Sequence, residues 1–136
     1  MDKLRMLAFA ISAAAILSFT QFPFATTMQT RAVYTAALDR ATEAYQDADG
    51  KCGQLEGHGK DMCAVEARAV KKRANALAEA NYRGTIQARM ESRIANADAD
   101  WMIARTACNA MSGEEKTLCV RTAKASNIKL VSDARS

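Results

Sequence analysis

The stretches YQDADGKCGQLEGHGKDMC (residues 45–63) and WMIARTACNAMSGEEKTLC (residues 101–119) decide the fold of this 136-residue chain. Each contains two cysteines separated by ten residues, and an offset of 56 residues aligns the two pairs. The aligned residues are Cys52 with Cys108, Cys63 with Cys119, Gly57 with Gly113, Lys60 with Lys116, Ala67 with Ala123 and Ala69 with Ala125. These matches indicate an internal duplication over about residues 32–76 and 88–132.

Apolar residues upstream of each cysteine pair repeat at helical spacing. They are Tyr34, Leu38, Ala41, Tyr45, Ala48 and Cys52 in the first copy, and Met90, Ile94, Ala97, Trp101, Ala104 and Cys108 in the second. Steps of 4, 3, 4, 3 and 4 residues keep each series on one side of an α-helix, as in a coiled coil. Each series is therefore predicted to be the seam along which a helix packs on its neighbour.

The segment between the cysteines of each pair is predicted to interrupt the helix. The first pair contains or adjoins Gly50, Gly53, Gly57 and Gly59. In the second, Ser112 and Glu115 have the spacing of a capping box, and Glu114 adds negative charge at a helix start. Asp61 is expected to act in the same way after the first break. Each pair then marks the tip of a helical hairpin, with one cysteine on each arm.

An unbroken helix is the alternative for these segments. Two cysteines eleven residues apart would fall on nearly the same face, because three helical turns take about 10.8 residues. The glycines disfavour this alternative in the first copy, and the capping box disfavours it in the second.

The breaks predict an all-α fold of antiparallel hairpins, with helices over about residues 28–51, 61–109 and 113–133. In one arrangement the middle helix is continuous and carries the outer helices along its two halves, which gives a thin rod. In the other, the middle helix breaks near Gly84 and the chain folds into a compact four-helix bundle. A glycine inside a helix costs only about 1 kcal/mol, so both arrangements stay open.

Residues 1–25 have the layout of a secretory signal peptide. Lys3 and Arg5 precede an apolar run over residues 6–19, which is short for a membrane span of about 20 residues. Phe22-Pro23-Phe24-Ala25 follows the run and supplies the expected cleavage site after Ala25.

Cleavage there would leave residues 26–136 as a single domain in the periplasm or outside the cell. Pro23 is atypical for the site, because a small residue usually stands three positions before the cut. The alternative is an uncleaved anchor in the inner membrane, formed by residues 6–25.

Export changes how the four cysteines are interpreted. In an oxidising compartment an even number of cysteines points to structural disulfides, here one staple at each tip. Staples are expected because 29 of the 136 residues are alanine and only 6% are aromatic, which predicts a thin core. A bridge closing about 12 residues contributes roughly 3 kcal/mol in the chain-entropy account.

The residues give no sign of catalysis, so the chain is predicted not to be an enzyme and to hold no cofactor or metal. The cysteine spacing of ten fits neither the close pairs of a zinc site nor a Cys-x-x-Cys redox motif. His58, between two glycines, is expected to be a surface residue of a turn. Glu114 and Glu115 are interpreted as partners of a helix dipole and not as an acid–base pair.

Binding residues are equally few. Tyr45 and Trp101 occupy equivalent positions and are expected to pack against the facing helix and shield the disulfides, in preference to forming a ligand site. The net charge is +4, and its densest run is Lys71-Lys72-Arg73. Such a run is expected to be a solvated helix face, so no nucleic-acid or small-molecule partner is predicted.

The pattern aromatic-x6-Cys-x4-Gly-x2-Lys-x2-Cys-x3-Ala, present twice, resembles small exported Ala-rich helical proteins of proteobacteria, some of which are named for a likeness to TolA. The resemblance covers most of residues 26–136 and implies the periplasmic location and the disulfides. No activity is assigned to that group, so it implies none here. The first copy departs from the pattern in its extra glycines.

Three functions follow as hypotheses. The first is a structural or interaction protein of the cell envelope, which binds an envelope protein or itself. The second is a binding module for anionic lipid or another acidic ligand, using Arg68, Lys71, Lys72 and Arg73. The third is a thiol-based stress or metal protein, which would require free cysteines.

Overall fold

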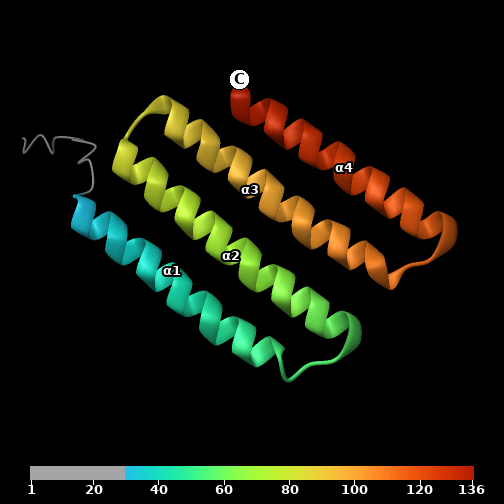
Figure 1. Cartoon of the computed structure of the whole chain (residues 1–136). Helices are drawn as coiled ribbons and strands as arrows, with labels where there is room; N and C mark the ends of the chain where they lie inside the picture. Colours follow the sequence, from blue (N-terminus) through green and yellow to red (C-terminus); the bar gives the residue numbers. More distant parts are fainter. Residues whose placement is uncertain (1–29) are drawn as a thin grey trace, which may run out of the picture.

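A computed structural model describes residues 30–136, and these form four long helices joined by short turns (Figure 1). The expected signal peptide, residues 1–25, lies outside the described residues. The helices are α1 (Arg31–Cys52), α2 (Gly57–Arg83), α3 (Ile86–Ala107) and α4 (Gly113–Arg135), and a short 3-10 turn, η1 (Cys108–Ala110), follows α3. The prediction of an all-α protein is confirmed for this part of the chain.

The first tip is shorter than the glycines suggested. α1 continues through Gly50 to Cys52, and α2 already begins at Gly57, so only residues 53–56 leave the helix. Gly57 adopts a φ of +54°, a left-handed conformation that glycine reaches without steric cost. The predicted start at residue 61 was wrong, and Asp61 lies in the second turn of α2, beyond the first-turn position expected for it.

The second tip follows the prediction in position but not in every contact. α4 begins at Gly113 after the N-cap Ser112, and Glu114 and Glu115 lie in its first turn. The Ser112 side chain makes no capping hydrogen bond, so the predicted capping box does not form. Gly113 has a φ of +57°, close to the +54° of Gly57 at the other tip.

The predicted continuous helix over residues 61–109 does not form, and the rod is therefore wrong. Gly84 ends α2 in the left-handed conformation, with a φ of +63°, and its amide donates to the Ala80 carbonyl. Thr85 then caps α3 by accepting a hydrogen bond from the Ala88 amide. This adjacent stop and start gives the chain a tight reversal, which Arg83 spans through an ion pair with Glu91 at 2.6 Å.

The compact four-helix bundle does not form either. Extensive helix–helix contacts join α1 to α2, α2 to α3 and α3 to α4, and α1 and α4 lie at opposite edges of the array (Figure 1). The described chain is thus an open layer one helix thick, with its helices side by side in chain order. Only the two inner helices are packed on both sides.

The open layer follows from how the buried residues are distributed. α1 buries Ala41 and Cys52, and α4 buries only Ala134. Each outer helix therefore has one narrow stripe of buried residues, which packs against a single neighbouring helix. A closed bundle needs every helix to bury a stripe against two neighbours. The inner helices do so with small residues, which are Val65, Ala67, Ala69, Ala78 and Ala80 in α2, and Ala88, Ser92, Ala97 and Ala99 in α3.

Polar and aromatic contacts complete the interfaces. The rings of Tyr34 and Tyr82 stack with centroids 4.6 Å apart and join the N-terminal end of α1 to the C-terminal end of α2. Ion pairs of Lys72 with Asp98 and of Arg73 with Asp100 join α2 to α3. Both pairs are only partly buried, and solvent-accessible pairs contribute about 0–1 kcal/mol, so alanine packing and the covalent tips have to hold the layer together.

Candidate functional surface

Each tip is closed by a disulfide, Cys52–Cys63 between α1 and α2, and Cys108–Cys119 between η1, directly after α3, and α4. The Cα atoms are 5.4 Å apart in the first bridge and 5.7 Å apart in the second, which are ordinary separations. Both N-terminal cysteines are buried. With both bridges formed, the described chain holds no free thiol.

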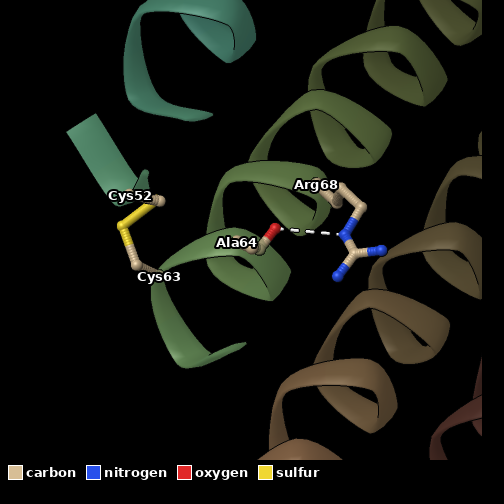
Figure 2. The surroundings of a disulfide bond; sticks show 4 residues. All are labelled: Cys52, Cys63, Ala64 and Arg68. Carbon is tan, nitrogen blue, oxygen red and sulfur yellow. Dashed lines mark hydrogen bonds between the residues drawn. A yellow bond between two sulfur atoms is a disulfide. The ribbon is translucent and has the colours of Figure 1, made fainter. Parts of the chain in front are cut away.

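Figure 2 shows the surroundings of the disulfide at the first tip. His58 lies half-buried in the first turn of α2, whereas the sequence predicted an exposed turn. Arg68 turns away from the disulfide, and its Nε donates to the Ala64 carbonyl at 3.1 Å (Figure 2). Over residues 30–136, no three His, Cys, Asp or Glu side chains gather where they could hold a metal ion.

Each of the basic residues proposed for an acidic ligand makes a contact within the protein. Lys71 lies over the Tyr45 ring, with its Nζ 5.1 Å from the centroid. Lys72 pairs with a carboxylate of α3 at 3.2 Å, and Arg73 pairs with another. The structure therefore gives this cluster an intramolecular role between the helices.

The equivalent aromatic residues Tyr45 and Trp101 are both half-buried. Tyr45 faces α2, because the ammonium group of Lys71 lies on its ring. This contact fits the expectation that Tyr45 packs against the facing helix. Trp101 lies in α3 on the same seam as the buried residues Ala97 and Cys108.

A more informative feature is a series of shallow grooves between neighbouring helices. The α1/α2 groove is lined by Ala37, Arg40, Ala41, Ala74, Leu77, Ala78 and Asn81. The α2/α3 groove is lined by Leu77, Ala80, Asn81, Ile86, Arg89, Ser92 and Arg93. The α3/α4 groove is lined by Arg93, Asn96, Ala97, Asp100, Leu130, Asp133 and Ala134.

These grooves open on the same side of the layer. Leu77 and Asn81 border both grooves beside α2, and Arg93 borders both grooves beside α3. A fourth groove, between α3 and α4 near the second tip, includes Met111, Leu118 and Ser126. It continues the α3/α4 groove, because Ser126 lies one helical turn from Leu130. We call this side of the layer the groove face.

Exposed large apolar side chains gather on the groove face. Five of them line its grooves, namely Leu77, Ile86, Met111, Leu118 and Leu130. Val70 joins them because it lies two helical turns before Leu77, and Val33 joins them because it lies one turn before Ala37. The groove face thus carries seven of the nine exposed large apolar residues in the described chain.

The two remaining residues lie elsewhere. Leu55 is in the first tip, and Ile128 is about 200° around α4 from both Ser126 and Leu130. Ile128 therefore points to the opposite face, with a side chain 59% exposed, against 57% for Leu77 and 58% for Val70. Ile128, Leu77 and Val70 are thus equally exposed, and they differ only in the face of the layer on which they lie.

Charged side chains lie on the opposite face. On α2, Arg68 and Glu79 are about 180° and 200° from Leu77, and on α3, Glu91 is about 200° from Arg89. Hydrogen bonds from Gln87 and then from Arg83 hold the pKa of Glu91 below its ordinary value. The two faces therefore differ in their exposed large apolar side chains, most of which lie on the groove face, whereas ion pairs occur on both faces.

Sequence reasoning missed the groove face. Val70 and Leu77 were two apolar residues at a spacing of seven, which is a weak signal in one helix. The other members belong to separate helices or to a tip, and only the side-by-side packing of four helices brings them to one surface.

Comparisons with known proteins add no assignment, because no family model, no curated protein and no solved structure matches this chain. None of the helices within residues 30–136 combines the length and apolar character needed to span a membrane.

Proposed function

We propose that this protein is an exported, non-catalytic component of the cell envelope, which binds another protein through its groove face. One observation carries the proposal. Seven of nine exposed large apolar side chains lie on one face of a layer that has no second layer over it within the described chain. Apolar patches of this kind on a soluble domain usually mark interaction surfaces.

Export is part of the proposal and rests on the sequence. The signal-peptide layout of residues 1–25 supports it, and so do two disulfides, since such bridges persist in oxidising compartments. The resemblance to exported Ala-rich helical proteins of proteobacteria points the same way. Mass spectrometry of the N-terminal peptide from the producing cell tests it, with a mature end at Thr26 as the expected result.

We also infer that the layer arose from a duplicated helical hairpin. The groove residues Ala37, Arg40, Ala41, Ala74, Leu77 and Ala78 correspond, at an offset of 56, to Arg93, Asn96, Ala97, Leu130, Asp133 and Ala134, which line the α3/α4 groove. Gly57 and Gly113 share a positive φ under the same offset. Duplication explains why both hairpins open their grooves on the same side.

Two other functions have weaker support. A binding module for anionic lipid would need free cations, but three of the four basic residues named for it have partners within the protein. A thiol-based or metal protein would need unpaired cysteines, and the four cysteines form two bridges. Protein binding by the groove face requires no change in the structure.

A photoactivatable amino acid at position 77 tests the proposal in the producing cell. We expect a crosslinked product with a protein, because Leu77 lines two neighbouring grooves of the groove face and is exposed. The same amino acid at position 128 is the matched control, since Ile128 is equally exposed on the opposite face. Absence of any protein adduct at position 77, or equal adducts at both positions, would overturn the proposal.

A further inference from the structure

We propose that the partner of the groove face is the groove face of a second copy of this chain, in an antiparallel two-layer dimer of eight helices. This inference rests on the proposed function, because it assumes that the face binds protein. Three properties of the face lead to it, namely its size, the spread of its apolar residues and its distribution of charge.

The area of the face is sufficient for a stable dimer. Four helices spaced about 9 Å apart form a layer about 36 Å wide. Helices of 22 to 27 residues are roughly 33–40 Å long. The face therefore covers about 1,200 Å², whereas a stable interface of standard size buries about 800 Å² on each partner.

The apolar residues are spread over every helix of the face. Val33 lies on α1, Leu77 on α2, Ile86 on α3 and Leu130 on α4. A single bound helix would follow one groove and leave most of them in water. A partner with the same width as this layer covers all of them, and a second copy has that width.

Charge divides the face into two halves. Near the Gly84 turn, Arg40, Arg89 and Arg93 border the grooves, whereas Glu66 and Glu115 lie toward the disulfide tips. Glu66 is on this face because it lies one turn before Val70. Within residues 30–136, none of these five charged groups forms an ion pair.

The other charges of the face are neutralised in place. Lys51 pairs with Asp47, Arg73 with Asp100 and Lys129 with Asp133. Arg93 also donates a hydrogen bond to the Ala134 carbonyl at 2.7 Å, which holds its guanidinium over the α3/α4 groove. The net pattern is a positive half beside the turn and a negative half beside the tips.

This pattern selects one orientation of the dimer. A two-fold axis in the plane of the layer and perpendicular to the helices places the positive half of each copy over the negative half of the other. An axis parallel to the helices would place like charges together, which is unfavourable. Because the antiparallel contact is isologous, each favourable pairing occurs twice and the assembly closes at two copies.

The test is the mass of the protein in solution, measured by sedimentation over a range of concentrations. The full chain is expressed with its own N-terminus and recovered from the envelope fraction of the producing cell. We expect twice the mass of one mature chain. Leu77→Glu and Val70→Glu should each raise the dimer Kd by at least ~100-fold, since every substitution buries two unpaired carboxylates in the dimer. Ile128→Glu should leave the Kd within about threefold.

A charge reversal tests the orientation. Arg89→Glu should weaken the dimer about tenfold or more, and adding Glu66→Arg to it should restore most of the loss. Circular dichroism checks that each variant keeps its helices, which is expected because the substituted side chains are exposed in one copy. Equal weakening by Ile128→Glu, or no rescue in the double variant, would refute the antiparallel dimer.

The outcome also separates this inference from the proposed function. A monomer at ~100 μM whose position 77 crosslinks to a different protein would overturn the dimer and leave the interaction role standing. A monomer with no protein adduct at that position would overturn both. A crosslinked product with twice the mass of the chain would support both.

Discussion

Removing the second disulfide should release α4 from the layer. α4 contacts only α3 extensively, and Ala134 is its one buried residue. The Cys108–Cys119 bridge therefore provides much of what holds α4 in place. The perturbation is the double variant Cys108→Ala and Cys119→Ala, in which alanine avoids leaving a buried hydroxyl without a partner.

The magnitude follows from the loop that the bridge closes. With both cysteines included, the loop spans 12 residues. In the chain-entropy account such a bridge contributes about 3 kcal/mol, because it restricts the state in which the two arms are apart. That free energy corresponds to roughly 100-fold in the equilibrium between docked and undocked α4.

Hydrogen exchange followed by mass spectrometry measures this equilibrium peptide by peptide. Amides of residues 120–135 should lose about 100-fold of their protection in the variant, whereas amides of α1 should change little. The matched control is Cys52→Ala with Cys63→Ala, which should transfer the effect to α1. If α4 kept its protection within threefold of the parent, the argument that the bridge holds α4 would be refuted.

Further predictions concern two glycines and the ionisation of Glu91. Gly84→Ala should lower the free energy of unfolding in urea by about 1–2 kcal/mol, because alanine is strained at a φ of +63°. Gly50→Ala should instead raise it by up to about 1 kcal/mol, since Gly50 is helical and an added Cβ meets no atom within 4 Å; the same sign for both would contradict the assignment. Because the pKa of Glu91 is lowered by folding, ionised Glu91 should stabilise the fold at pH values above 4.5, the ordinary pKa of a glutamate. This contribution is lost as the pH falls through the pKa of the folded state. Glu91→Gln should remove that part of the acid dependence in urea titrations between pH 3 and 7, and an unchanged dependence would show that Glu91 contributes nothing.

Local features of the fold could be predicted because short-range physics determines them. The 4-3-4-3-4 spacing identified the seams that bury Ala41, Cys52, Ala97 and Cys108. The glycines of the first cysteine pair and the Ser112 and Glu115 spacing of the second identified both tips. The exact bounds of the helices were harder to predict. Gly50 and Gly59 were expected to lie in the break between helices, but both lie inside a helix.

The break at Gly84 was left open for a physical reason. A glycine inside a helix destabilises it by only about 1 kcal/mol relative to alanine, and this free energy does not decide between a continuous helix and a reversal. The decisive information lies in the pair Gly84-Thr85, which supplies a left-handed stop followed at once by an N-cap. Reading the two residues together, and not the glycine alone, predicts the reversal.

The groove face could not be predicted from helical periodicity. Its members come from all four helices and one tip, and their shared orientation depends on how the helices pack side by side. The open layer itself depends on an absence, since the outer helices lack a second buried stripe within residues 31–52 and 113–135. The lack of a second buried stripe can be recognised only once it is known which neighbouring helix covers the first one.

The staples and the groove face have the same origin in this composition. A layer of alanine-rich helices buries small side chains, and each buried methyl-sized group contributes only about 0.8 kcal/mol. The disulfides raise the stability of the single layer without enlarging its core. They leave Leu77, Val70 and the other large apolar side chains of the groove face in water. A second layer would bury those side chains and thicken the core at once, so binding and stability are expected to rise together in this protein.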